Sequence, residues 1–316
     1  MTLPSVAIII PTRNRPELLK RCLSRLVPYV GVHHECSITV SDDGNAAETK
    51  EALAGEMRVQ VVQGPRRGPA ANRNYGAAHS TGEIIVFLDD DCIPDPDLIV
   101  AYQDAAYNNP DVGVFEGRIS ATSGITGFAD MVLINETGGY LWSCNFAIRR
   151  ELFASIGGFD ERFPFAAVED VEFHFRVKKR SAVPFLPNAR VWHDTERRRG
   201  WRIVQHRALC DVLYLHLHGS KATGRTSGFY IRHLARSLIL RGWKHLRAGA
   251  TKDPMQLILE SVSQLQLVLI TLAWRFHPAL ARMFYPSCCP GCESIHANLT
   301  THNSPSPALQ GEKDAT

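Results

Sequence analysis

The stretch Ile84-Ile-Val-Phe-Leu-Asp-Asp-Asp91 passes from five apolar residues directly into three carboxylates. A short, uniformly apolar run is typical of a strand that is buried on both faces of a parallel sheet. Val6-Ala-Ile-Ile-Ile10 is a second run of this kind. Further β-branched runs and the helix-patterned segments between them lie at 37–40, 59–62, 16–27 and 69–79. This alternation predicts an α/β domain with a mostly parallel sheet and flanking helices.

The pattern becomes less regular after this point. Asp95-Pro96 is expected to begin the next helix, with a capping carboxylate and a proline in the first turn. Further strands are expected at 112–119 and 142–148, a helix at 169–179, and an edge strand that ends with Arg190-Val-Trp-His193. We expect three parts: a catalytic domain (1–196), a basic helical region (197–286) and a disordered tail (287–316).

Length and composition are those of a globular chain. The 316 residues are 45% hydrophobic and 21% charged, enough to bury one large core or two smaller ones. No basic segment followed by an apolar run stands at the start, so we expect a cytoplasmic protein whose eight cysteines are free thiols. The group Cys288, Cys289 and Cys292, with His296 nearby, is only half a zinc site, and we expect an incidental or structural role for it.

Positive charge is concentrated in one part of the chain. Residues 197–252 contain thirteen Lys and Arg but a single acid, Asp211, which leaves a net −9 on the rest of a chain whose total is +3. Between 232 and 247, apolar residues recur at helical spacing opposite arginines. Such a helix can lie on an anionic membrane surface or cap the catalytic domain. The charge count favours peripheral docking at the inner membrane face; no nucleic-acid motif accompanies it, and no uncharged stretch is long enough to span a bilayer.

Polar residues follow three of the predicted strands. They are Pro11-Thr-Arg-Asn14, Asp42-Asp-Gly44 and Asp89-Asp-Asp91. Ligands of open parallel sheets bind outside the carboxyl ends of the strands, so one pocket is expected there. Three adjacent carboxylates next to a buried strand repel one another unless a cation compensates, and Mg²⁺ or Mn²⁺ suits oxygen ligands of this kind.

Six motifs occur in an order that covers roughly residues 5–195: Ile10-Pro-Thr-Arg-Asn14, Ser41-Asp-Asp-Gly44, Gly68-Pro-Ala-Ala-Asn-Arg-Asn74, Phe87-Leu-Asp-Asp-Asp91, Gly157-Gly-Phe-Asp160 and Glu169-Asp170. This ordered set resembles the family 2 glycosyltransferases. The resemblance implies a GT-A fold and an inverting transfer of a sugar from a nucleotide-diphosphate sugar. Cys92 and Asn45 stand where the family often has an acid and a serine, and Cys92 could alter the choice of donor.

The resemblance also implies roles for individual residues. Asp43 would hydrogen-bond the base imide, and Asp91 would be the chief ligand of Mn²⁺ or Mg²⁺, joined by Asp89 and His193. The expected nucleotide-sugar contacts are Pro11, Thr12, Arg13, Asn14, Asp43, Arg73, Asp89 and Asp90. A surface salt bridge remains the alternative for Arg73, and an ordinary hydrogen-bonded histidine the alternative for His193.

On the acceptor side, the resemblance implies that Asp170 is the catalytic base and that Glu169 contacts the acceptor. Trp142 could stack on a sugar ring. The alternatives are helix capping for the two acids and core packing for Trp142.

The expected function is therefore a metal-dependent inverting glycosyltransferase, using a UDP-sugar most commonly, that glycosylates a glycan or lipid-linked acceptor in cell-surface polysaccharide or glycolipid synthesis. Two alternatives remain: a sugar-nucleotide-binding protein without transferase activity, and a sugar nucleotidyltransferase. The second would need a glycine-rich basic loop after the first strand, which Pro11-Thr-Arg-Asn14 does not supply.

Overall fold

The computed structural model describes residues 3–30, 36–56, 58–197, 200–241, 243, 247, 252–276, 295 and 299. Two compact units are present, one formed by residues 1–124 and 132–195, the other by residues 125–131 and 196–316. The first unit contains the sheet with its flanking helices, and the second contains the basic helices.

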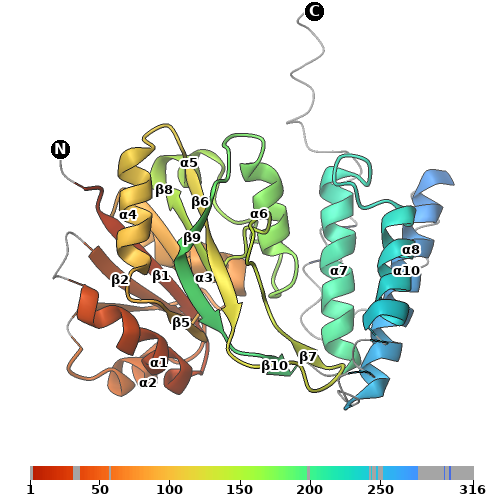
Figure 1. The fold of residues 1–316 in the computed structure, drawn as a ribbon, viewed down its shortest axis with the longest axis horizontal. Helices are drawn as coiled ribbons and strands as arrows, with labels where there is room; N and C mark the ends of the chain where they lie inside the picture. The colour runs from red at the N-terminus through yellow and green to blue at the C-terminus, as the bar shows by residue number, and fades with distance from the viewer. Residues whose placement is uncertain are drawn as a thin grey trace, which may run out of the picture. The chain divides into compact units, whose positions relative to one another are not determined.

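An eight-stranded sheet forms the centre of the first unit (Figure 1). Its order is β3-β2-β1-β4-β8-β6-β9-β5. The strands are β1 (Val6–Thr12), β2 (Cys36–Asp42), β3 (Val59–Gln63), β4 (Ile84–Leu88), β5 (Cys92–Pro94), β6 (Val114–Ala121), β8 (Asn145–Arg149) and β9 (Phe185–His193). The first four strands run parallel, β8 is antiparallel to both its neighbours, and β9 is parallel to β6. The expected α/β architecture, mostly parallel, is confirmed.

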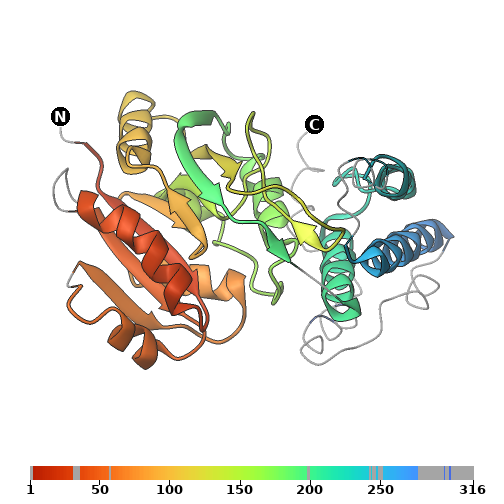
Figure 2. The ribbon, with the colours of Figure 1, turned by 60° about the horizontal axis from the view of Figure 1, so that its bottom comes forward.

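Helices cover both faces of the sheet (Figures 1 and 2). They are α1 (Pro16–Leu26), α2 (Ala46–Ala52), α3 (Pro69–Ala78), α4 (Leu98–Asn108), α5 (Arg150–Ser155) and α6 (Glu169–Val177), with a 3₁₀ turn at Val27–Tyr29. Successive β1 side chains alternate between faces: Ile8 packs with α1 and α4, whereas Ile9 packs with α3, α5 and α6. Both faces of the sheet are buried, which explains why the strand sequences are apolar throughout.

The structure differs from the sequence expectations at three places. β1 and β2 continue into the polar motifs, because Thr12 pairs with Asp42 across the two strands. β9 is one continuous inner strand; the edge is the short β5, which the sequence did not reveal. Asp95 is not a helix cap, since α4 begins at Leu98 and the Asp95 carboxylate accepts from Arg190 and Trp192.

The second unit is built from helices α7 (Trp201–His218), α8 (Ser227–Arg236) and α10 (Pro254–Phe276), with a π-helical turn at Ser237–Arg241. A short ribbon pairs β7 (Asp130–Met131) with β10 (Glu196–Arg197). α10 packs against α7 and α8. The predicted helical character of 197–285 is therefore found wherever that segment is described, except at β10 and in loops; residues 277–285 lie outside the described part, as do the tail beyond Leu299 and the C-terminal cysteine group.

Candidate active site

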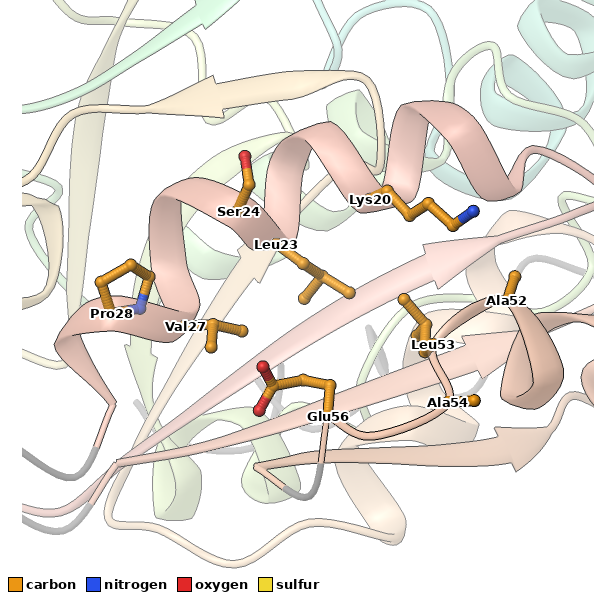
Figure 3. A pocket seen from close by; sticks show the side chains of 9 residues that line it. All are labelled: Lys20, Leu23, Ser24, Val27, Pro28, Ala52, Leu53, Ala54 and Glu56. Carbon is orange, nitrogen blue, oxygen red and sulfur yellow. The ribbon is translucent and has the colours of Figure 1, made fainter.

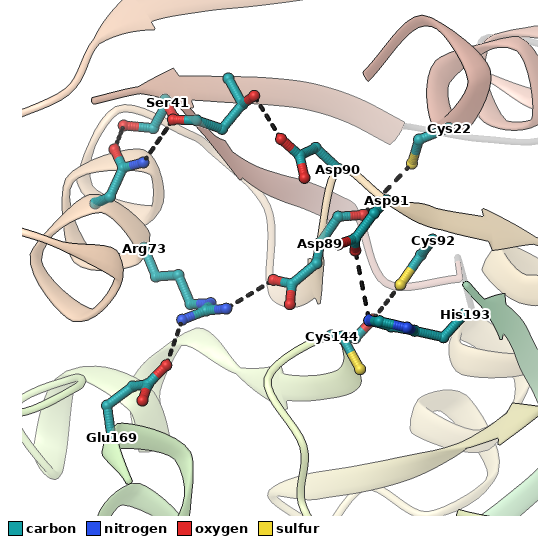
Figure 4. Close-up of polar contacts among 12 residues, drawn as sticks. Cys22, Ser41, Arg73, Asp89, Asp90, Asp91, Cys92, Cys144, Glu169 and His193 are labelled. Atoms are coloured by element: carbon teal, nitrogen blue, oxygen red, sulfur yellow. Dashed lines mark hydrogen bonds and ion pairs between the residues drawn. The ribbon is translucent and has the colours of Figure 1, made fainter. Parts of the chain in front are cut away.

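The three acids after β4 point in different directions and have different partners (Figure 4). Asp90 is fully buried, where Thr12 Oγ1 donates to it at 2.6 Å and Arg15 pairs with it at 2.7 Å. Burial raises the pKa of Asp90 to about 7, although Arg15 and Thr12 oppose the rise. Both carboxylate oxygens are thus engaged by this chain, so Asp90 ties the end of β1 to the acid motif.

Asp91, which directly precedes the edge strand β5, faces His193 at the end of the neighbouring strand β9. Asp91 Oδ1 lies 3.5 Å from His193 Nε2, and both side chains are buried. His193 Nδ1 lies 2.7 Å from the carbonyl of Asp194, and a carbonyl only accepts, so Nδ1 carries the proton. In a neutral imidazole this leaves the Nε2 lone pair directed toward Asp91, which is the arrangement of metal-binding histidines.

An all-oxygen site suits both Mg²⁺ and Mn²⁺. Here the donors are a carboxylate oxygen and an imidazole nitrogen, and the nitrogen favours Mn²⁺ over Mg²⁺. Asp91, Cys92 and His193 offer three ligand atoms within 4.8 Å of one another. Cys92 does not fit this role, because its thiol donates to the carbonyl of Cys144. The Cys144 side chain, followed by burial, also raises the pKa of Cys92 well above the usual range. Of these three residues, Asp91 and His193 therefore fit an ion, and the expected part of Asp89 in the metal site stays a prediction.

Two arginines, just before and within α1, hold this acid cluster from one side. Arg15 reaches Asp91 at 3.3 Å as well as Asp90, and Arg21 donates to the backbone carbonyl of Asp91 at 3.1 Å. Arg21 also pairs with Asp194 at 2.5 Å, next to His193. Neither arginine was predicted from the sequence; the signal for both was their position in and just before the helix that follows Pro11-Thr-Arg-Asn14.

Arg73 joins the acid motif to α6 (Figure 4). Arg73 is 3% exposed, and its guanidinium contacts Asp89 at 2.6 Å and Glu169 at 3.2 Å, above the ring of Phe159. Burial would lower the pKa of Arg73, but the two carboxylates raise it instead, so the charge is kept. For Asp89, burial acts to raise the pKa and Arg73 holds it below the usual value. The alternative of a surface salt bridge is wrong, because this pair is buried.

Asp170 stands in the first turn of α6, beside Glu169. Burial, followed by the neighbouring charge of Glu169, raises the pKa of Asp170 to about 8. Burial raises the pKa of Glu169 as well, against the opposing effect of Arg73. Glu169 Oε2 accepts from the backbone of Ala167, whereas Asp170 accepts from the backbone N–H of Val171. A carboxyl that holds its proton more tightly than usual, beside a second buried acid, is a candidate general base.

Asp43 lies on the far side of β1 from the acid motif. Its two carboxylate oxygens accept from the backbone of Arg66 at 2.8 Å and of Gly68 at 3.0 Å. Gly68 has a φ of +97°, and a Cβ there would lie 2.2 Å from the carbonyl oxygen of Pro164, so only glycine suits this turn. Pro11 and Thr12 are buried at the end of β1, whereas Arg13 and Asn14 are exposed on the turn that follows.

Trp142 is half-buried and its ring stacks on that of Tyr140, with centroids 5.6 Å apart and planes at 2°. The loop that carries them is held by Glu116, a buried carboxylate of β6 that accepts from the backbone of Gly139 at 2.8 Å and from Tyr140 and Asn135. Trp142 also packs against the core, which agrees with the core-packing alternative, whereas stacking on a sugar ring stays a prediction. Tyr140 and Glu116 were not predicted from the sequence. One acidic residue within a strand does not indicate which loop its carboxylate will bind.

The structure therefore joins Asp89, Arg73 and Glu169 in one buried network, with Asp170 next to Glu169 in the first turn of α6. Asp91, two residues after Asp89, lies against His193. A hollow between α1 and the end of α2 is lined by Leu23, Leu53, Glu56 and their neighbours (Figure 3). No predicted site residue lines that hollow, so it does not compete as the site.

Residues 7–157 match the model described as Glycosyl transferase family 2. The chain contains a family 2 glycosyltransferase domain. It is 29% identical over 205 residues to the O-antigen biosynthesis protein RfbC of Myxococcus xanthus, a match that covers 55% of this chain and 16% of the relative. It is 30% identical over 95 residues to the GalNAc(5)-diNAcBac-PP-undecaprenol beta-1,3-glucosyltransferase of Campylobacter jejuni, covering 28% and 30%. The chain spans less than half the length of these curated relatives.

Solved structures support the fold of this glycosyltransferase domain. The structure of GalNAc-T7 with UDP, GalNAc and Mn²⁺ superposes with a TM-score of 0.56 at 17% identity, covering 72% of this chain and 50% of that one. The expected GT-A fold with additional C-terminal helices is thereby confirmed. At this identity the likeness speaks for the fold alone.

Proposed function

We propose that this domain transfers a sugar from a nucleotide-diphosphate sugar, most simply a UDP-sugar, to a hydroxyl acceptor with inversion at the anomeric carbon. The observation that carries the proposal is the buried guanidinium of Arg73, which bridges Asp89 of the acid motif and Glu169 beside Asp170. One cation thus fixes the donor-side acids relative to the acceptor-side acids. A binding protein without chemistry would not require that link.

On the donor side, Asp43 and the end of β1 would receive the nucleotide, with Arg13 and Asn14 exposed beside them. Asp91 and His193 would hold Mn²⁺ or Mg²⁺, and the bound ion would supply positive charge against the departing diphosphate. Arg15 lies against the same acids and can donate to phosphate oxygens once they replace its contacts to Asp90 and Asp91.

On the acceptor side, Asp170 would take the proton of the acceptor hydroxyl as that oxygen bonds to the anomeric carbon. The bond between this carbon and the diphosphate oxygen breaks, and the diphosphate leaves with the electron pair. The raised pKa of Asp170 suits a group that must remove a proton from a hydroxyl at the moment of attack. Glu169 keeps Arg73 in place, and the stacked Tyr140–Trp142 pair offers an aromatic face to a sugar ring.

The relatives support a glycan or lipid-linked acceptor, since one is named for O-antigen biosynthesis and another for a glucosyl transfer to an undecaprenol-linked glycan. We propose that this protein likewise serves cell-surface polysaccharide or glycolipid synthesis at the inner membrane face. A screen of UDP-, GDP- and dTDP-sugars for Mn²⁺-dependent thermal stabilisation and for transfer tests this directly. Stabilisation without turnover of any donor and acceptor would favour the binding-protein alternative.

His193→Ala is expected to weaken Mn²⁺ binding by about 10–100-fold, because even groups that only orient a metal ligand contribute that much. A calorimetric titration with Mn²⁺ in the presence of UDP measures the change in affinity. His79→Ala removes an exposed histidine at the end of α3 and should leave the affinity unchanged. Equal affinities for the parent protein and the His193 variant would remove His193 from the metal site.

The transfer rate is expected to fall as the pH drops below about 8, the value to which the pKa of Asp170 is raised. A general base acts only when ionised, so kcat/KM should fall about tenfold per pH unit on this acid limb. Glu169→Gln removes the like charge that contributes to the raised pKa and should move the limb to lower pH. A limb that stays in place in this variant, or one near pH 4, would contradict the assignment.

A further inference from the structure

The second unit contains a helix that leaves an apolar side exposed. On α10, five apolar side chains are between 39% and 61% exposed: Met255, Ile258, Val262, Leu265 and Leu269. At 3.6 residues per turn they fall within an arc of about 80°, and we call them the α10 stripe. A helix at a water-facing surface would place these residues inward and its polar residues outward.

The buried side of α10 is mixed: polar residues lie there beside the apolar Leu267, Val268, Ile270 and Ala273. Gln256, Ser263 and Thr271 are each at most 5% exposed and lie roughly opposite the stripe. Gln256 accepts from the backbone of Gly200 at 3.0 Å, and Thr271 donates back to the carbonyl of Leu267 at 2.8 Å. These contacts satisfy polar groups inside the unit, so the orientation of α10 is built in and its apolar side is left outward.

The neighbouring helix presents the same kind of surface. α8 packs against α10, and Ile231, Leu238 and Ile239, on α8 and the turn after it, are 49–67% exposed. The apolar face predicted for 232–247 is therefore not buried within its own unit where it is described. Arg232 and Arg236 are exposed on the same helix, and Arg247 lies 4.8 Å above the ring of Trp243.

Two properties of this surface identify its occupant. Pro254–Ala273 is the one helical stretch within the described residues that is long and apolar enough, by length and composition, to cross a bilayer, and it has a single charge, Glu260. Residues 197–252, which precede it, contain thirteen basic residues and one acid. Apolar side chains flanked by exposed arginines match a layer of acyl chains under anionic headgroups.

We propose that the α10 stripe, together with the exposed face of α8, inserts into the headgroup region of an anionic lipid bilayer. α10 lies in the interface with its buried side held by α7 and α8, so the unit binds the membrane peripherally. This lipid contact does not depend on the proposed function. Only the further proposal, that the protein meets a lipid-linked acceptor at the membrane, rests on the proposed function.

The test is co-sedimentation of the full chain with vesicles of phosphatidylcholine alone and with added phosphatidylglycerol, at low salt. The parent protein is expected to pellet with the anionic vesicles. Val262→Gln/Leu265→Gln should reduce binding about tenfold or more, since each side chain loses its burial in lipid. Val100→Gln/Tyr107→Gln, two comparably exposed apolar residues of α4 in the other unit, should change nothing.

Arg232→Gln/Arg236→Gln is expected to reduce the preference for phosphatidylglycerol about tenfold, while much of the weaker binding to neutral vesicles remains. The Asp170→Asn protein should pellet like the parent, which separates failure of the lipid contact from failure of the proposed chemistry. A parent protein that stays in the supernatant with both vesicle types would overturn the proposal. So would a parent dimer that the stripe variant converts to a monomer without any lipid binding, because a second copy would then be the occupant.

Discussion

Asp170→Asn is expected to lower the transfer rate by about 10²–10⁴-fold while leaving donor binding intact. The amide keeps the shape of the carboxyl but cannot take the acceptor proton. The donor-side acids keep their own partners, since Arg73 contacts Asp89 and Glu169 rather than Asp170. Transfer kinetics together with a donor titration measure the two quantities separately. Asp104→Asn, on the exposed side of α4, is the matched control.

The same variant is expected to be more stable than the parent at alkaline pH. The pKa of Asp170 is raised in the fold, so the unfolded chain ionises first and stability is lost as the pH rises from about 4 toward 8. The Asp170→Asn change removes that loss, and a gain of about 1 kcal/mol would raise Tm by roughly 2–4 °C at pH 8. At pH 4 the two proteins should melt together. Unchanged activity, or a lower Tm at pH 8, would contradict the role given to Asp170.

Arg73→Met is expected to cost about 3–5 kcal/mol of stability and to abolish transfer. Removing the guanidinium leaves two acids, Asp89 and the buried Glu169, without the cation that compensates them. Chemical denaturation gives the free energy of unfolding, and the assay with the best donor gives the activity.

Arg67→Met supplies the control for this change. Arg67 pairs with Glu161 at 2.9 Å at the surface, where such a pair contributes about 0–1 kcal/mol. If the two variants lost similar stability, the Arg73 bridge would have no special weight. If Arg73→Met were folded and fully active, the observation that carries the proposed function would be lost.

The positions of the central strands could be predicted from the sequence, because parallel strands buried on both faces have continuous apolar sequences. Ile84–Leu88 has the bounds expected from its sequence, and Val6-Ala-Ile-Ile-Ile10 differs only in extending to Thr12. β5 was not predictable, since Cys92-Ile-Pro94 is too short to show a period and forms only by pairing with β9. The helix expected at Asp95-Pro96 was misplaced because the carboxylate meets a stronger partner, Arg190, from a distant strand.

For the site, the acids were visible in the sequence and their partners were not. Motif order indicated Asp89, Asp91, Glu169 and Asp170, but the partner of each acid depends on long-range geometry. Arg73 was expected near the donor, and its second contact to Glu169 spans 96 positions of sequence. Arg15 and Arg21 look like ordinary surface arginines in the sequence. Only the fold brings them against Asp90, Asp91 and Asp194.

The pairing of Cys92 with His193 fixes the imidazole beside Asp91 through backbone alone. Side chains along a strand alternate between faces, so inserting or deleting one residue in β5 or β9 would turn His193 away from Asp91. A long stretch of chain separates these two strands, and the loops within it are free to change length in evolution or engineering. Tolerance to length change should therefore end abruptly at the two segments that meet at this edge.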